Sequence, residues 1–165
     1  MRITDKYVFF WNGTFSQWKR ANMVIDGVTY NCCEQYMMYK KAMLFGDEDT
    51  ADLIMEESHP FDQKELGRQV KNFNKEKWDA VCKDYVFEAN YAKFTQNKKL
   101  KAEMLETGDR MFVEASPKDT IWGIGMYDTD HGIEDPKNWK GTNWLGEVLT
   151  NVKKKIQDED SRNAK

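Results

Sequence analysis

A helix whose apolar face contains two charges is the strongest constraint that this sequence places on its fold. Residues 33–47 read CEQYMMYKKAMLFGD, and steps of three and four residues select one helical face. That face contains Glu34, Met37, Met38, Lys41 and Phe45. The helix is apolar enough to be buried, so we expect Glu34 and Lys41 to point inward. A buried charge is costly unless it is paired. The two residues therefore form a structural ion pair or part of a pocket, unless Lys41 extends into solvent.

The rest of the chain predicts an α+β fold that is mainly helical. Short strands, expected to be antiparallel, are predicted at 7–11, 111–115 and 121–126, with a hairpin at 23–30. Apolar periodicity predicts helices at 33–45, 47–57, 61–70, near 100–105 and at 145–156, and one of about twenty residues that begins near Asn72 or Asn74. We expect these elements to surround a pocket.

One domain accounts for the whole chain of 165 residues. Its core should extend from about 7 to 156, and the polar tail 157–165 should fray. Gly46 should end the helix at 33–45, and Asp47 should cap the next helix. Residues 127–138 are expected to form an exposed loop or lid.

Composition narrows the class of function. A net charge of -3 gives no general attraction to nucleic acid or to an anionic membrane. No apolar run has the roughly 20 residues of a membrane helix, and the first residues lack a signal-peptide core, so we expect a cytoplasmic protein. The three cysteines lack the spacing of a zinc site, and only two histidines are present. We therefore expect no metal and no cofactor.

Several short blocks occur in the order typical of a known family. They are Phe15-Ser16-Gln17-Trp18, Glu34 to Met38, Lys41 to Asp47, Leu66-Gly67-Arg68, Lys93-Phe94, Thr107-Gly108, Asp119 with Trp122 to Gly125, Trp139-Lys140-Gly141, Asn143 and Leu145-Gly146. In these blocks the chain resembles the NADAR, or YbiA-like, family. The resemblance implies a single domain with an N-glycosidase pocket. Some family members have an acid directly after Trp-Gly, where this chain has Ile124, so that role does not carry over.

The resemblance also implies roles for individual residues. Glu34 and Lys41 would be catalytic, and the substrate-binding residues would be Phe15, Ser16, Gln17, Trp18, Arg68, Asp119, Trp122, Gly123 and Asn143. Trp18 and Trp122 would stack on the base or ribose, Arg68 would hold a phosphate, and Asp119 and Asn143 would orient hydroxyl groups. The cleft should lie between the helix at 33–45 and the segment around Trp122.

The implied reaction breaks the bond between C1 of a ribose and an amino group on a base. Glu34 would transfer a proton or stabilise positive charge on C1, and Lys41 would attack the opened sugar to form a Schiff base. A neutral Lys41 requires a pKa lowered by roughly three units, or about 4 kcal/mol. Burial favours this shift, and a charged Glu34 opposes it.

Three substrate hypotheses follow from the resemblance. The first is removal of ADP-ribose from guanine, presented in DNA or as a nucleotide. The second is hydrolysis of phosphorylated ribosylamino-pyrimidines, which are intermediates of riboflavin synthesis. The third is a nonenzymatic module that binds ADP-ribose or a nucleotide. Retention of both Glu34 and Lys41 favours an enzyme, because a binding module needs neither inward charge. The sequence does not specify an oligomeric state.

Overall fold

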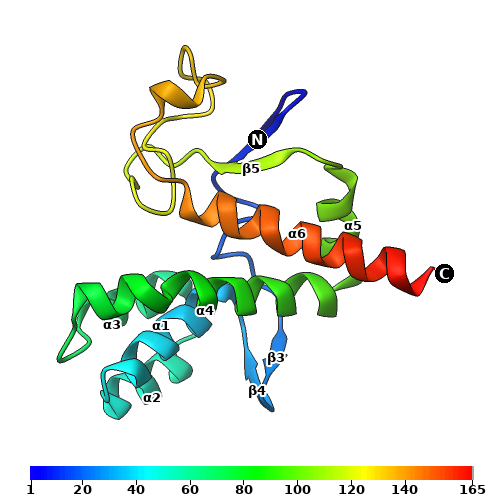
Figure 1. Cartoon of the computed structure of the whole chain (residues 1–165). Coiled ribbons are helices and arrows are strands. Elements are labelled where there is room, and N and C mark those ends of the chain that lie inside the picture. Colours follow the sequence, from blue (N-terminus) through cyan, green and yellow to red (C-terminus); the bar gives the residue numbers. More distant parts are fainter. Residues whose placement is uncertain (165) are drawn as a thin grey trace. The chain divides into compact units, whose positions relative to one another are not determined.

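The computed structural model describes residues 1–164, which form two compact units (Figure 1). One unit contains residues 1–16 together with the chain from residue 98 onward, and the other contains residues 17–97. Helices dominate, and the strands are short. The predicted α+β, mainly helical fold class is therefore confirmed.

The unit formed by residues 17–97 is built around a central helix. Its elements are the strands β3 (Met23–Ile25) and β4 (Val28–Tyr30) and the helices α1 (Cys33–Leu44), α2 (Glu48–Glu56), α3 (Pro60–Arg68) and α4 (Lys75–Gln96). The two strands pair as the predicted antiparallel hairpin. Helix α1 packs against α2, α3 and α4, which explains why nearly all of its first two turns are buried. One hydrophobic cluster joins the hairpin, α1 and α4 through Met23, Tyr30, Cys33, Tyr36, Ala89 and Ala92.

Local sequence signals set the helix ends in this unit. Gly46 adopts a φ of 73°, a conformation that glycine adopts without strain, and thereby lets the chain turn after α1. Asp47 then caps α2 by accepting a hydrogen bond from the Thr50 amide at 3.2 Å. Asn74 caps α4 through the Lys77 amide at 3.0 Å. The cap predicted at Asp47 is thus confirmed, and of the two candidates Asn72 and Asn74 for the start of the long helix, Asn74 is the cap.

The other unit combines a small sheet with three helical segments. Its elements are β1 (Arg2–Ile3), β2 (Tyr7–Phe10), α5 (Lys98–Glu106), β5 (Met111–Glu114), the 3-10 helix η1 (Pro136–Asn138) and α6 (Trp144–Asn163). The strand order is β1-β2-β5, and α6 packs on β5. The strand β1 was not predicted from the sequence, and it pairs antiparallel with β2. The strands β2 and β5, which we expected to be antiparallel, run parallel with Tyr7 opposite Met111.

The prediction of a strand at 121–126 is wrong. Alternating glycines and large apolar residues resemble a strand, but Gly125 has a φ of 68°, which breaks an extended backbone. The segment is instead a folded loop held by distant backbone groups. The Ile124 amide donates to the Glu114 carbonyl at 2.9 Å, and the Lys140 amide donates to the Ile124 carbonyl at 2.9 Å. Ile124 itself is fully buried against the sheet.

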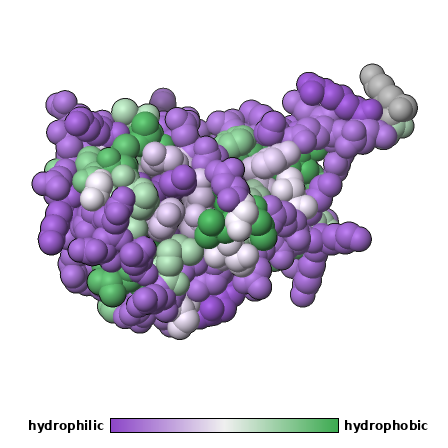
Figure 2. All heavy atoms as spheres, turned by 90° about the horizontal axis from the view of Figure 1, so that it is seen from below, coloured by the Kyte–Doolittle hydropathy of each residue, from purple (hydrophilic) through white to green (hydrophobic). Residues whose placement is uncertain are grey.

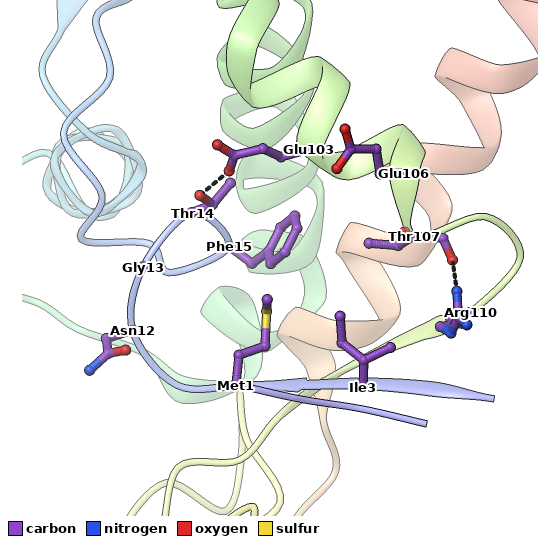
Figure 3. Close-up of a pocket in the computed structure, with 10 residues that line it drawn as sticks. All are labelled: Met1, Ile3, Asn12, Gly13, Thr14, Phe15, Glu103, Glu106, Thr107 and Arg110. Atoms are coloured by element: carbon purple, nitrogen blue, oxygen red, sulfur yellow. Dashed lines mark hydrogen bonds between the residues drawn. The ribbon is translucent and has the colours of Figure 1, made fainter. Parts of the chain in front are cut away.

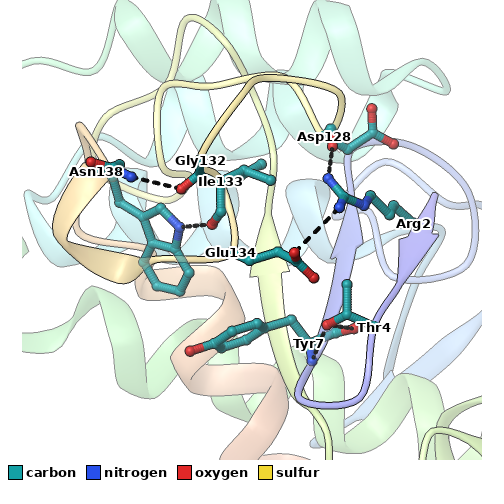
Figure 4. A network of polar contacts seen from close by, with 9 residues as sticks. Arg2, Thr4, Tyr7, Asp128, Gly132, Ile133, Glu134 and Asn138 are labelled. Atoms are coloured by element: carbon teal, nitrogen blue, oxygen red, sulfur yellow. Dashed lines mark hydrogen bonds and ion pairs between the residues drawn. The ribbon is translucent and has the colours of Figure 1, made fainter.

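The segment expected to be an exposed loop or lid has internal order (Figure 4). The Trp139 indole donates to the Ile133 carbonyl at 2.7 Å, and the Asn138 amide donates to the Gly132 carbonyl at 2.8 Å. The side chain of Arg2 on β1 donates to the Asp128 carbonyl at 3.2 Å. These bonds tie the segment to itself and to the edge of the sheet.

Helix α6 continues to Asn163 and so includes most of the tail 157–165 that we expected to fray, of which residue 165 lies outside the described residues. Fraying of this tail stays a prediction. Contacts with the same unit hold its last turns. Lys101 of α5 pairs with Asp160 at 3.0 Å, and the Gln157 side chain donates to the Gly108 carbonyl at 3.3 Å. Polar composition alone did not reveal these partners because they lie 49 and 59 residues away in sequence.

The exposed surface is rich in charge. Figure 2 shows one face, on which hydrophilic residues predominate and hydrophobic residues form separate patches. Charged residues make up 32% of the sequence, which accounts for this appearance. None of the helices formed by residues 1–164 has the length and apolar character needed to cross a membrane.

Substitution of Gly146 tests the contact between α6 and β5. A Cβ atom at this position would lie 2.1 Å from the Phe112 carbonyl oxygen, so α6 would have to move away from the strand. We expect Gly146→Ala to lower the free energy of unfolding by about 1–3 kcal/mol through overpacking. This loss should occur although alanine has the higher helix propensity by about 1 kcal/mol. Urea unfolding measures it. Lys154→Ala on the exposed side of α6 is the matched control, and equal stability of the two variants would contradict the packing.

Candidate functional site

The first turn of α1 places Glu34 inside the unit formed by residues 17–97. Its side chain belongs to a residue that is only 4% exposed, so the predicted inward orientation is confirmed. The Glu34 amide donates to the backbone carbonyl of Gln17 at 3.1 Å. This bond satisfies one of the amide groups that a helix leaves unpaired at its N-terminus. It also brings two of the predicted site residues together.

The Gln17 side chain is almost completely buried next to α4. Its Oε1 accepts a hydrogen bond from Asn90 Nδ2 at 2.8 Å. Its Nε2 is buried and has no hydrogen-bond partner among residues 1–164. Leaving a buried donor unpaired costs about 1–3 kcal/mol, so such groups are rare in folded proteins. Gln17 therefore has a free donor at the start of the helix that contains Glu34.

Lys41 lies two helical turns after Glu34 and is partly buried. Its Nζ lies 4.7 Å from the centroid of the Phe73 ring and 6.0 Å from that of Trp78. Desolvation by these surroundings lowers the pKa of Lys41, the negative charge of Glu34 opposes the shift, and the positive charge of Arg68 adds to it. The amine is thereby easier to deprotonate than an ordinary lysine. This direction agrees with the balance that we inferred from the sequence.

Arg68 ends α3 on the side of Lys41. Helix α3 approaches α1 closely because Gly67 has no side chain; a Cβ there would lie 2.0 Å from the Met38 sulfur. The Arg68 side chain is 61% exposed and pairs with Glu65 at 2.5 Å. An exposed guanidinium with a single exposed partner remains accessible to an incoming anion.

Trp18 is also accessible. The residue is 39% exposed, which is unusual for such a large apolar ring. The Lys64 Nζ of α3 lies 6.0 Å from the ring centroid. Trp18 thus presents an exposed aromatic surface directly after Gln17.

In the other unit, Asp119 organises the segment that contains Trp122. Its Oδ1 accepts from the Ile121 amide at 2.9 Å and from the Trp122 amide at 2.8 Å. This is an Asx-type turn, which fixes the backbone around the tryptophan. The Trp122 ring is partly exposed and packs edge-to-face on Trp144 with centroids 5.7 Å apart.

Gly123 and Asn143 are buried in the same unit, next to β5. A Cβ at Gly123 would lie 2.9 Å from the Glu114 carbonyl oxygen, so only glycine fits this close approach. Asn143 Oδ1 accepts from the Glu114 amide at 2.9 Å, and Nδ2 donates to the Phe112 carbonyl at 3.1 Å. Both ends of the Asn143 amide are therefore engaged with β5. Its visible role is to hold the end of this strand.

Phe15 and Ser16 follow a turn after β2. Phe15 is 3% exposed and packs on Phe112 with ring centroids 4.6 Å apart. The Ser16 amide donates to the Gly13 carbonyl at 3.0 Å.

A cavity of about 480 Å³ lies beside Phe15 in the same unit (Figure 3). Its lining comprises Met1, Ile3, Asn12, Gly13, Thr14, Phe15, Glu103, Glu106, Thr107 and Arg110. Of the eleven predicted site residues this set includes Phe15 alone, so this cavity is not the predicted pocket.

Lys93 is a buried lysine that belongs to one of the family-like blocks but to which we assigned no role from the sequence. The residue has 0% exposure on α4, one turn after Asn90. Burial lowers the pKa of Lys93 to about 8, against the opposing influence of Cys33 and Cys32. The signal was present in the sequence, since steps of three and four residues from Ala89 lead to Ala92 and Lys93.

The predicted residues thus divide between the two units. Gln17, Trp18, Glu34, Lys41 and Arg68 lie in one, and Phe15, Ser16, Asp119, Trp122, Gly123 and Asn143 lie in the other. The cleft expected between α1 and the segment around Trp122 stays a prediction. Within residues 1–164, no group of three or more His, Cys, Asp or Glu side chains is placed to hold a metal ion.

Comparison with known proteins identifies relatives along most of the chain. Residues 8–157 match the model of the NADAR domain. N-glycosidase R617 of Acanthamoeba polyphaga mimivirus is 44% identical over 168 residues, which cover 93% of this chain and 98% of that protein. Protein irg-1 of Caenorhabditis elegans is 43% identical over 130 residues, which cover 77% of this chain and 61% of irg-1. The matched region thus spans less than two thirds of irg-1.

A bacterial relative has a solved structure. N-glycosidase YbiA of Escherichia coli is 29% identical over 147 residues, which cover 89% of this chain and 83% of that protein. Its NMR structure superposes with a TM-score of 0.78 at 27% identity, covering 96% of this chain and 89% of YbiA. The two proteins share a fold.

The titration of Lys41 should respond in opposite directions to its two charged neighbours. Glu34→Gln removes the charge that opposes deprotonation, so we expect the Lys41 pKa to fall further. Arg68→Ala removes a positive charge, so we expect the pKa to rise. NMR titration of the lysine side chains measures both. Arg20→Ala, an arginine on the same unit, should leave the Lys41 titration unchanged. Shifts of the opposite sign would refute the assigned causes.

Lys93 should make stability depend on pH in a defined window. Its pKa is about 8 in the folded protein and about 10.4 when unfolded, so between these values the unfolded chain holds more protons. The free energy of unfolding, taken relative to Lys93→Met, should therefore rise by about 2–3 kcal/mol from pH 7 to pH 10. Chemical denaturation of both proteins at several pH values measures this difference. A constant difference would show that Lys93 titrates normally.

Proposed function

The chain belongs to the NADAR family, and from this premise we propose that it is an N-glycosidase that removes ADP-ribose from guanine in a nucleic acid or nucleotide. One observation carries the proposal. A buried carboxylate, Glu34, and a partly exposed lysine with a lowered pKa, Lys41, lie on the same helix. Hydrolysis of an N-glycosidic bond needs both a proton donor and a group that meets an electrophilic carbon.

Glu34 is assigned to proton transfer. The bond between C1 and the base nitrogen breaks most easily when the nitrogen leaves with an added proton. A carboxyl group in a secluded position can deliver that proton without loss to bulk water. The Gln17 carbonyl holds the backbone of Glu34 in place during this step.

Lys41 is assigned to covalent catalysis. Once the ribose ring opens, C1 is an iminium carbon bonded to the base nitrogen. The neutral Nζ adds to C1, the base amino group leaves with its proton, and C1 remains bonded to Lys41 as a Schiff base. Water then adds to C1 and releases the lysine, so the net reaction consumes one water. The lowered pKa supports this role because only the neutral amine is nucleophilic.

The remaining assignments concern binding. Exposed Arg68 would exchange its carboxylate partner for a substrate phosphate, and the exposed ring of Trp18 would stack on the base or ribose. Trp122 would contribute a second ring, oriented by Asp119. For Asn143 we propose a supporting role on β5 in place of the hydroxyl contact that the sequence suggested, because both ends of its amide are occupied. A cytoplasmic location remains part of the proposal.

Two alternatives use the same residues. Phosphorylated ribosylamino-pyrimidines of riboflavin synthesis also have nitrogen on C1 and a nearby phosphate, so the same acid and lysine would serve. A nonenzymatic module that binds ADP-ribose would need Arg68 and the rings alone. The lowered pKa of Lys41 favours an enzyme over such a module, because a lysine that only pairs with phosphate gains nothing from becoming neutral.

Two assays of product release test the function. One measures free ADP-ribose released from ADP-ribosylated guanosine, and the other measures ribose phosphate released from the pyrimidine substrates. We expect Glu34→Gln and Lys41→Ala each to lower the rate by about 10²–10⁴-fold. Lys40→Ala is the matched control, because Lys40 is the neighbouring lysine on α1 and its Nζ also lies near an aromatic ring, 5.5 Å from the centroid of Tyr36. Borohydride added during turnover should leave a sugar adduct on Lys41 and none on Lys40.

The results separate the hypotheses. Full activity of Lys41→Ala with no adduct would exclude the covalent step, and an unchanged rate for Glu34→Gln would exclude the proton transfer. Turnover of the pyrimidine substrates alone would select the riboflavin-type reaction. Binding of ADP-ribose without release from any substrate would select the nonenzymatic module.

A further inference from the structure

The unpaired donor of Gln17 is the starting observation. Gln17 is 9% exposed, its Oε1 accepts from Asn90 Nδ2 at 2.8 Å, and its buried Nε2 has no partner among residues 1–164. A buried amide donor without a hydrogen-bond partner is rare in folded proteins and calls for an explanation. Its persistence suggests that Nε2 has an acceptor that the protein itself does not provide.

Asn90 prevents the Gln17 amide from turning. Asn90 Nδ2 donates both to Gln17 and, at 2.8 Å, to the Val86 carbonyl, which is only an acceptor. Asn90 Oδ1 accepts from the Cys33 thiol at 3.5 Å. Burial raises the pKa of Cys33 to about 12, so this thiol stays protonated and remains a donor. These bonds fix Nδ2 of Asn90 as the end that faces Gln17. If the Gln17 amide turned by 180°, its own NH2 group would face the NH2 group of Asn90.

The position of Gln17 relative to Glu34 indicates what the free donor is for. The Gln17 carbonyl accepts from the Glu34 amide at 3.1 Å, so the two residues are fixed to each other at the start of α1. This backbone bond places Gln17 beside the residue to which proton transfer is assigned, and a neutral side-chain donor on Gln17 suits a neutral acceptor such as a ribose oxygen.

We propose that Asn90 is a positioning residue that fixes the Gln17 side chain so that its Nε2 donates a hydrogen bond to a ribose oxygen of the bound substrate. This inference rests on the proposed function and adds to it a residue on α4 that acts on the substrate through Gln17. Asn90 orients the donor, and Gln17 makes the contact.

The sharpest test replaces the hydrogen-bond donor at position 90 with an acceptor. Asn90→Asp replaces the donor with an acceptor, so the Gln17 amide should turn and present Oε1 to the sugar. The probe is ADP-ribose, with its Kd measured by calorimetry. We expect Asn90→Asp and Gln17→Leu each to weaken binding about fivefold to tenfold. In the Gln17→Leu background, Asn90→Asp should have less than a twofold effect, because the residue through which it acts is gone.

Asn97→Asp is the matched control. Asn97 Nδ2 also donates to a carbonyl four residues earlier in α4, that of Lys93, at 2.8 Å, and it does not contact Gln17. We expect this variant to bind ADP-ribose as the wild type does. Thermal unfolding of every variant shows whether it is folded. If Asn90→Asp does not fold, the contact between Gln17 and the ligand is tested in the wild type by NMR. We expect the signals of the Gln17 side-chain amide to shift when ADP-ribose is added.

Several results would overturn the inference. One is that Asn90→Asp still weakens ADP-ribose binding in the Gln17→Leu background, and another is that folded Gln17→Leu binds ADP-ribose as the wild type does. The inference would also fail if the NMR signals of the Gln17 side-chain amide did not shift, or if the wild type did not bind ADP-ribose. Failure of the proposed function looks different. Binding of ADP-ribose with no hydrolysis of any substrate would reject the N-glycosidase, while the binding cycle would still decide the role of Asn90.

Discussion

The burial of polar groups along α1 is the constraint on which the helical unit depends. A buried donor or acceptor without a hydrogen-bond partner destabilises the folded protein. Most buried polar groups therefore have a partner. Gln35 is the clearest case. Its Nε2 donates to the Ile54 carbonyl of α2 at 3.2 Å, and its Oε1 accepts from the Asn31 amide at 2.8 Å. Gln63 of α3 donates to the Glu57 carbonyl at 2.8 Å. Against this background the unpaired Nε2 of Gln17 is conspicuous.

Access to solvent separates two lysines whose pKa values are both lowered by desolvation. Lys93 has 0% exposure, so burial makes it a poor nucleophile for a substrate that must reach it. Lys41 is partly exposed, although its Nζ lies near the rings of Phe73 and Trp78. A reactive lysine needs both a reduced pKa and an open approach. Lys41 meets both conditions, which is why the covalent step is assigned to it.

Local signals were readable from the sequence, and distant pairings were not. Asp47 and Asn74 cap their helices through residues three positions away, so a short window contains both partners. The strand predicted at 121–126 failed because its alternation is also compatible with a loop, and the decisive bonds come from Glu114 and Lys140. For the site, the helical period identified Glu34 and the resemblance supplied Gln17. Asn90 was missed, because its role depends on a residue 73 positions earlier.

The charge balance near Lys41 bears on how a phosphate substrate fits an acidic protein. The net charge of -3 gives no overall attraction, so the proposed binding of a substrate phosphate would depend on local cations such as Arg68. A phosphate that simply neutralised Arg68 would remove the positive charge that helps to lower the Lys41 pKa. Glu65 already pairs with Arg68 at 2.5 Å in the free protein. In the proposed exchange a phosphate would replace this carboxylate, so Arg68 would stay paired with an anion as it is in the free protein. We therefore expect the substrate to be held while Lys41 keeps its lowered pKa.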